Sequence, residues 1–219
     1  VVTNVLAQYA RETGSQYLNH YPGVWRYAAE RCSRRLLSRD EAKRVYGWYL
    51  DEYCASMPLH GDVERFLMRC RAEGLRVGVV ANGNADRIDA FVEARGLNAL
   101  VDTVVASGAT PFQKPAVELF GLALRNVDVP GHRAIFVGDR LDTDVSGANR
   151  SGMWSLRLRR GPASEAVPEA SEEVPDAAVD GLDEVWGLPL LGETADLDTA
   201  VIMAWNAALR ASTTSSGRK

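Results

Sequence analysis

The sequence predicts an α/β fold, a doubly wound parallel sheet accompanied by a small all-helical domain, and three observations support this class. Short apolar runs, several of them rich in β-branched residues, recur at residues 75–81, 102–105, 134–137 and 153–158. Stretches with the apolar spacing of amphipathic helices lie between the runs, and this alternation is typical of a parallel sheet. All seven tyrosines lie in the first 53 residues, ahead of the first run, which indicates a separate unit.

Residues 1–57 are predicted to form the helical domain. The sequence from Ser38 to Glu41 has the pattern of a capping box, which opens a helix. Apolar and aromatic side chains then recur with helical spacing, at Tyr46, Tyr49, Leu50 and Tyr53. These aromatic residues are compatible with two roles, the core of a small helical domain or the lining of a substrate site, and the sequence leaves both open.

Residues 58–191 are predicted to form the α/β core. Within it, residues 161–176 hold three prolines and five acidic residues, a composition that predicts a surface loop. An edge strand is expected directly afterwards, at residues 176–179. Residues 192–219 are predicted to form a terminal amphipathic helix and a flexible tail, and the helix depends on the spacing of Val201, Ile202, Trp205 and Leu209.

Composition excludes several classes of function. The chain has 25 basic and 29 acidic residues, a net charge of −4, which argues against a nucleic-acid groove or an anionic membrane surface as its main partner. Its longest apolar stretches are far shorter than the ~20 residues of a membrane helix, and no secretory leader is evident. Its three cysteines show no disulfide or zinc-site spacing. We therefore expect a cytoplasmic protein that binds a small molecule.

Polar residues follow three of the predicted strands, where ligands bind in open parallel sheets. Asn82 and Gly83 end the first strand, and the loop after the second leads to Lys114. The third strand is followed by a group of carboxylates that includes Asp139 and Asp144. A lysine, an amide-rich turn and clustered carboxylates at one sheet edge suit a phosphate bound together with a divalent cation.

Electrostatics favours this interpretation of the cluster. Neighbouring carboxylates repel one another unless a cation lies between them, and oxygen ligands with room for water favour Mg²⁺. An ammonium group and backbone N–H groups then neutralise the rest of the phosphate charge. Lys114 also precedes a helix that begins with Pro115, so the helix dipole favours an anion there. Taken singly, each feature also has an ordinary explanation as a solvated helix start, a cap or a tight turn.

The sequence resembles the haloacid dehalogenase-like hydrolase superfamily, in particular members with a helical cap near the N-terminus such as phosphoglycolate phosphatase and β-phosphoglucomutase. The resemblance extends over about residues 5–190. It is carried by residues 79–83, by Lys114-Pro115 with the Leu119-Phe120 that follows, and most specifically by residues 136–148.

The resemblance implies an activity and a role for each site residue. The implied activity is Mg²⁺-dependent hydrolysis of a small phosphomonoester through an aspartyl-phosphate. Asp139 would bind Mg²⁺, with Asp144 as a second acidic residue of the metal site. Lys114 would balance the charge of the phosphoryl group and the nucleophile, and Asn82 and Gly83 would contact phosphoryl oxygens. A dehalogenase, which attacks carbon without a metal, is an alternative that Asp144 disfavours.

Two departures from the family pattern concern catalysis. In the family, an Asp-x-Asp motif at the end of the first core strand supplies the nucleophile and the general acid, and nothing in the first ten residues matches it. Ala81 also stands where a serine or threonine is usual. We therefore expect these 219 residues to be inactive and the sheet to lack its central strand. Either Val1 is a misplaced start or a truncation, or the chain is a non-catalytic phosphate- or partner-binding member.

Overall fold

The computed structural model describes residues 22–48, 51, 58–160, 164–188 and 199–208. The chain divides into two compact units. The first unit contains Val1–Ser56 and Gly83–Gly96, and the second contains Met57–Asn82 and Leu97–Lys219. The assignment of residues 1–57 as a cap stays a prediction. Among the described helices, none has both the length and the apolar composition that a bilayer crossing requires.

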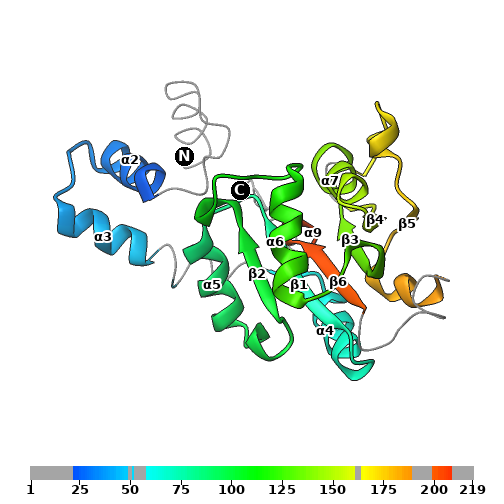
Figure 1. Ribbon diagram of the computed structural model, residues 1–219. Coiled ribbons are helices and arrows are strands. Elements are labelled where there is room, and N and C mark those ends of the chain that lie inside the picture. The colour runs from blue at the N-terminus through cyan, green and yellow to red at the C-terminus, as the bar shows by residue number, and fades with distance from the viewer. Residues whose placement is uncertain (1–21, 49–50, 52–57, 161–163, 189–198, 209–219) are drawn as a thin grey trace, which may run out of the picture. The chain divides into compact units, whose positions relative to one another are not determined.

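A six-stranded parallel sheet forms the centre of the second unit, and it confirms the predicted α/β class (Figure 1). Every pair of neighbouring strands is parallel, so the carboxyl ends of all of them lie at one edge. The spatial order is β2-β1-β6-β3-β4-β5. The strands are β1 (Arg76–Ala81), β2 (Thr103–Ala106), β3 (Ala134–Gly138), β4 (Trp154–Leu158), β5 (Ala177–Val179) and β6 (Ala200–Ala204).

The C-terminal strand β6 corrects two predictions. Residues 200–204 are extended and pair with β1 on one side and β3 on the other, whereas a helix was predicted through Val201 and Ile202. Within the described residues 199–208, the helical part is α9 (Trp205–Ala208), and Leu209 lies outside the described residues. The predicted absence of a central strand is also wrong, because β6 occupies that place.

The physical reason for the error lies in the composition of β6. Its sequence, Ala-Val-Ile-Met-Ala, is a continuous apolar run, and every residue of it is buried. A short run that is buried on both faces has no polar face to set a period, so periodicity cannot separate a strand from a helix. The adjacent β-branched side chains of Val201 and Ile202 favour the strand.

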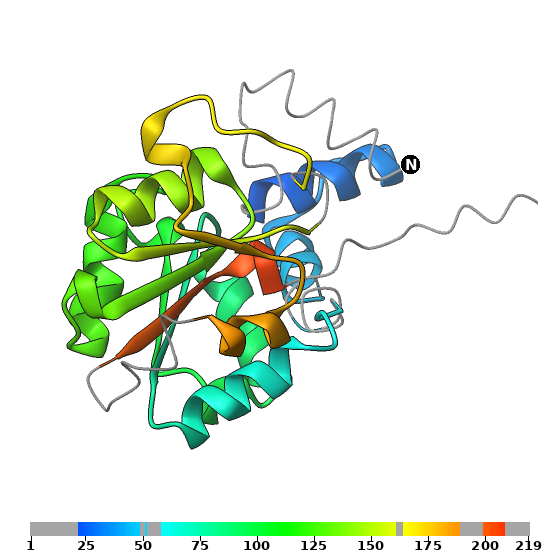
Figure 2. The ribbon, with the colours of Figure 1, turned by 90° about the vertical axis from the view of Figure 1, so that its right-hand side faces the viewer.

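Helices cover both faces of the sheet within the second unit. Figure 2 shows α6 (Val117–Val127) and α7 (Ser146–Arg150) on one side and α4 (Val63–Ala72) on the other. Phe120 of α6 packs on Phe136 of β3, with ring centroids 4.8 Å apart. Short 3₁₀ helices connect the elements at Leu97–Ala99, Ser107–Ala109, Gly131–Arg133, Ser171–Glu173 and Leu182–Gly187.

The first unit contains the helices α2 (Pro22–Ser33), α3 (Arg39–Trp48) and α5 (Ala85–Ala94). The predicted capping box is confirmed at the start of α3. The Ser38 N–H donates to Glu41 Oε2 at 2.9 Å, and the Glu41 N–H donates to Ser38 Oγ at 3.3 Å. Of the predicted aromatic stripe, Tyr46 is described and its hydroxyl donates to Asp86 Oδ2 at 3.0 Å, while Tyr49, Leu50 and Tyr53 lie outside the described residues.

The capping box predicts a pH dependence for α3. The Arg35 guanidinium donates twice to the Glu41 carboxylate, at 2.6 and 3.0 Å, and these bonds lower the pKa of Glu41 from 4.5 to about 2. Because the folded-state pKa is lowered, the contribution of Glu41 to stability is complete above pH 4.5 and is lost as the pH falls towards 2. We expect helicity measured by circular dichroism to fall over this range, and to fall less in Glu41→Gln.

Candidate functional site

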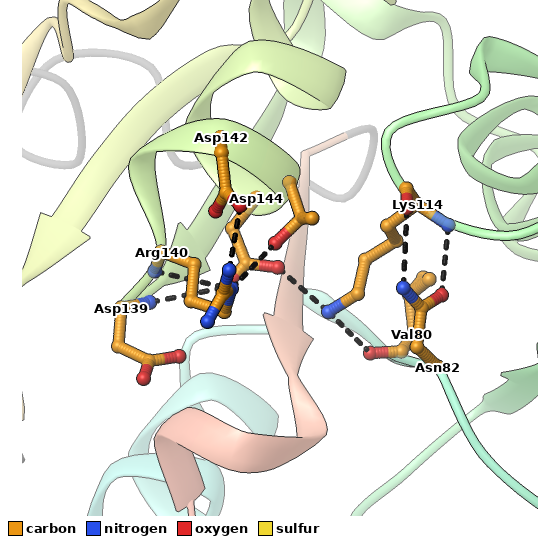
Figure 3. A network of polar contacts seen from close by, with 8 residues as sticks. Val80, Asn82, Lys114, Asp139, Arg140, Asp142 and Asp144 are labelled. Atoms are coloured by element: carbon orange, nitrogen blue, oxygen red, sulfur yellow. Dashed lines mark hydrogen bonds and ion pairs between the residues drawn. The ribbon is translucent and has the colours of Figure 1, made fainter. Parts of the chain in front are cut away.

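Three loops at the carboxyl edge of the sheet bring the predicted site residues together (Figure 3). Asn82 follows β1, Lys114 lies between β2 and α6, and Asp139 and Asp144 follow β3. We call these four residues the lysine–carboxylate site. They belong to the second unit, whereas Gly83 opens the stretch that belongs to the first unit. The contact predicted between Gly83 and a phosphoryl group therefore stays a prediction.

A buried ion pair forms the centre of the site. Lys114 Nζ lies 2.6 Å from Asp144 Oδ1, and the two side chains are only 3% and 1% exposed. The same ammonium group lies 3.5 Å from the Val80 carbonyl oxygen at the end of β1. Lys114 is thus held at the sheet edge between β1 and the loop after β3. Its burial argues against the ordinary explanation, in which a lysine at the start of a helix is exposed to solvent.

Asp144 also shapes the loop after β3. Its second oxygen, Oδ2, accepts hydrogen bonds from the backbone N–H groups of Asp139 and Arg140 at 3.1 and 3.2 Å. The turn needs a glycine at the end of β3, since a Cβ on Gly138 would lie 2.4 Å from the Asp144 Cβ. A single carboxylate therefore fixes both the position of Lys114 and the backbone that carries Asp139.

The Asn82 side chain holds the backbone of Lys114. The Lys114 N–H donates to Asn82 Oδ1 at 2.7 Å, and Asn82 Nδ2 donates to the Lys114 carbonyl at 3.1 Å. This two-point contact joins the end of β1 to the loop before α6. No local pattern predicts this contact, because the two residues are 32 positions apart in the sequence. The observed contribution of Asn82 is to position the lysine, and its contact with phosphate stays a prediction.

Asp139 carries the carboxylate that is suited to a cation. Its Oδ1 atom is buried, and no hydrogen-bond partner for it is found in the described part of the chain. Burial, and next the nearby carboxylate of Asp144, raise the pKa of Asp139 to about 6. Both effects disfavour the charged form of the Asp139 carboxylate, whereas a bound divalent cation would favour it.

The remaining acidic residues fit a metal less well. Both oxygens of Asp144 are engaged, by Lys114 and by backbone N–H groups. Asp142 is about half exposed and forms an ion pair with Arg140 at 2.5 Å. Within the described ranges, no group of three or more His, Cys, Asp or Glu side chains is arranged to hold a metal ion. The donor set therefore fits Mg²⁺ through Asp139, with the rest of the coordination shell left to water and ligand oxygens.

A cavity of about 310 Å³ lies beside the loop after β3. This volume is at the lower end of the range for small-molecule sites. Its walls come from that loop and from the segment before β5, and they are formed by Arg140, Leu141, Asp142, Ala166, Val167, Glu169 and Glu173.

The sequence did not indicate one component of this sheet edge, the carboxyl end of β6. Residue Ala204 ends that strand and is paired with Val80, whose carbonyl contacts Lys114. The apolar run at residues 200–204 could have indicated this strand, but it was interpreted as part of a helix outside the sheet.

A family model of haloacid dehalogenase-like hydrolases matches residues 6–152. The glyceraldehyde 3-phosphate phosphatase of Methanopyrus kandleri is 32% identical over 178 residues, which are 80% of this chain and 73% of the relative.

Two solved structures share the fold. A HAD phosphatase from Thermococcus onnurineus aligns with a TM-score of 0.60 and 22% identity, over 78% of this chain and 72% of that one. A 2-haloacid dehalogenase from Pseudomonas syringae pv. Tomato DC3000 aligns with a TM-score of 0.62 and 22% identity, over 84% and 77%. At this level of identity, the two structures show the fold and do not distinguish a phosphatase from a dehalogenase.

Proposed function

Because this chain belongs to the haloacid dehalogenase-like hydrolases, we propose that its lysine–carboxylate site holds the phosphoryl group of a small phosphorylated metabolite together with Mg²⁺. One observation carries the proposal. The buried ammonium group of Lys114 is held by Asp144, whose other oxygen accepts from the backbone N–H of Asp139. The Oδ1 atom of Asp139 is itself buried and has no hydrogen-bond partner among the described residues. The phosphatase relative from Methanopyrus kandleri supports a phosphoryl substrate over a carbon-bound halide.

Each residue of the site has a distinct role in this proposal. Asp139 would bind Mg²⁺ directly, and the bound ion would polarise a phosphoryl oxygen and neutralise part of its charge. Lys114 would neutralise another part of the phosphoryl charge. Asp144 would position Lys114 and the backbone of Asp139, and its direct contact with the metal stays a prediction. Asn82 would keep Lys114 in place from the other side.

The described site contains too few free carboxylates for hydrolysis. A covalent mechanism needs an oxygen nucleophile in addition to the ligands of the metal. Of the carboxylates on the loop after β3, Asp144 forms an ion pair with Lys114 and Asp142 forms one with Arg140, which leaves Asp139. One carboxylate cannot be both the metal ligand and the nucleophile. We therefore propose that this chain binds phosphate and Mg²⁺ as a member of a phosphatase lineage but does not turn over phosphomonoesters.

A turnover assay tests this proposal. We expect the 219-residue chain to release no p-nitrophenol from p-nitrophenyl phosphate above the rate of the buffer with Mg²⁺. The assay is repeated with Asp139→Asn and with Asp142→Asn, a matched control on the same loop whose side chain is 54% exposed. Mg²⁺-dependent release that Asp139→Asn abolishes and Asp142→Asn preserves would contradict the proposed inactivity.

A further inference from the structure

The carboxyl end of β6 lies between the two halves of the lysine–carboxylate site. Strand β6 pairs with β1, which ends beside Lys114, and with β3, which leads to Asp139 and Asp144. The register places Ala204 opposite Val80 and Met203 opposite Val137. Figure 3 shows β6 running between Lys114 on one side and the carboxylate loop on the other, with α9 following it.

The Lys114–Asp144 ion pair crosses the end of this strand. Lys114 Nζ lies 3.5 Å from the Val80 carbonyl on β1 and 2.6 Å from Asp144 Oδ1 beyond β3. Neighbouring strands in a sheet are about 4.8 Å apart, so β1 and β3 are about twice that distance apart, with β6 in the gap. The last residue of β6, Ala204, therefore lies at the sheet edge between the strand that ends beside Lys114 and the strand that leads to Asp139 and Asp144.

Ala204 contributes no chemistry to that place. Its methyl group is fully buried, and it has no donor, acceptor or nucleophilic atom in its side chain. The polar groups at this edge come from the loop before α6 and from the loop after β3, and they include the Lys114 ammonium group and the Asp139 carboxylate proposed to bind the metal. The missing function is an oxygen that attacks phosphorus.

We infer that position 204 is the nucleophile position of this site, and that alanine at this position is the reason why the site binds a phosphoryl group without transferring it. This inference rests on the proposed function. It assigns the position to the C-terminal strand, although the family resemblance places the nucleophile on the first strand of the core.

A carboxylate at position 204 would supply the missing nucleophile, and p-nitrophenolate is a good enough leaving group to depart without a general acid. One oxygen of the carboxylate would attack phosphorus, and the bond from phosphorus to the ester oxygen would break, so that p-nitrophenolate would leave with the bonding electrons. Water would then attack phosphorus, and the acyl phosphate bond would break to return the carboxylate and release inorganic phosphate. Overall, one p-nitrophenyl phosphate and one water give one p-nitrophenol and one inorganic phosphate. The attacking water supplies the proton that p-nitrophenolate takes up.

The direct test is Ala204→Asp, with Ala200→Asp as the matched control. Ala200 is equally buried and lies at the amino end of the same strand. Removing a catalytic nucleophile lowers kcat by a factor on the order of 10⁶. If Ala204→Asp recovers even a small part of that factor, its turnover of p-nitrophenyl phosphate should exceed that of the original chain at least ~100-fold. Intact-mass measurement is expected to show one added phosphoryl group on Ala204→Asp and none on Ala200→Asp.

A second measurement avoids the risk that a buried carboxylate prevents folding. The original chain is labelled with ¹³C in its alanine methyl groups, and Mn²⁺ with inorganic phosphate replaces Mg²⁺. Ala204 and Ala200 are four residues apart along β6, about 13 Å at the usual rise per residue. Paramagnetic broadening should therefore be much stronger for the Ala204 methyl, which is assigned from the signal lost in Ala204→Gly.

The outcomes separate the two proposals. If neither phosphate nor the divalent ion binds the original chain, the proposed function fails. If both bind but the Ala204 methyl is broadened no more than the Ala200 methyl, the inference is overturned. The inference is also overturned if Ala204→Asp folds and binds both ligands, yet gains neither turnover nor a phosphoryl group.

Discussion

Replacing Lys114 with methionine is expected to destabilise the second unit by about 3–5 kcal/mol, the usual effect of removing one partner from a buried ion pair. The reason is that the Asp144 carboxylate, which is 1% exposed, would lose the cation that compensates its charge. Methionine keeps much of the length and volume of lysine, so the change isolates the ammonium group. Urea unfolding followed by circular dichroism gives the free energy of unfolding.

The double variant Lys114→Met/Asp144→Leu is the control for this prediction. It removes both charges and so leaves no uncompensated group, and it should be more stable than Lys114→Met alone. Arg65→Met provides a second control, because the Arg65–Asp183 pair is about two-thirds exposed on both sides. If Lys114→Met lowered the free energy of unfolding no more than Arg65→Met does, the buried ion pair would not stabilise the second unit as predicted.

Gly138→Ala should have the second largest effect. The added methyl would lie 2.4 Å from the Asp144 Cβ and 2.6 Å from its Oδ2. These atoms adjoin the backbone of a short π-helix, Leu141–Val145, so they cannot move away as the end of a flexible side chain would. The Asp144 carboxylate would then lose its contact with Lys114 or its hydrogen bonds from the backbone N–H groups of Asp139 and Arg140. We expect a loss of about 1–3 kcal/mol of stability, as for overpacked cores, together with loss of phosphate binding.

Gly61→Ala is the matched control for Gly138→Ala. Gly61 belongs to the same unit, and a Cβ there would have no atom within 4 Å. Thermal unfolding and phosphate titration of both variants should show a large loss of stability and binding for Gly138→Ala and little change for Gly61→Ala. If the two variants lost the same stability and phosphate affinity, the close approach of Gly138 to Asp144 would not be needed for the structure of the site.

The sequence predicted much of the fold because most strands carry a local signal. The runs at 75–81, 102–105, 134–137 and 153–158 correspond to β1, β2, β3 and β4, and β5 lies within residues 176–179. Each of these runs is bounded by turn residues and separated from the next by a helix. The run at 200–204 is continuously apolar and entirely buried, so it has no periodicity of its own, and only its pairing with β1 and β3 identifies it as a strand.

The sequence predicted which residues form the site, but it predicted only part of the contacts between them. The rule that parallel strands end at one edge was enough to bring Lys114 together with Asp139 and Asp144. It does not determine which oxygen binds which donor. The pairing of Asp144 with Lys114 and the clamp from Asn82 depend on side-chain directions that the three-dimensional packing sets. The position of Ala204 at this edge depends on the strand order, which the sequence alone did not indicate.

The proposed binding of phosphate and Mg²⁺ at the lysine–carboxylate site is tested by calorimetry with inorganic phosphate, in the presence and absence of Mg²⁺. We expect phosphate to bind the original chain in the presence of Mg²⁺, and we expect Lys114→Met and Asp139→Asn each to abolish this binding while Asp142→Asn retains it. Phosphate affinity that is the same with and without Mg²⁺, and the same in all three variants as in the original chain, would contradict it.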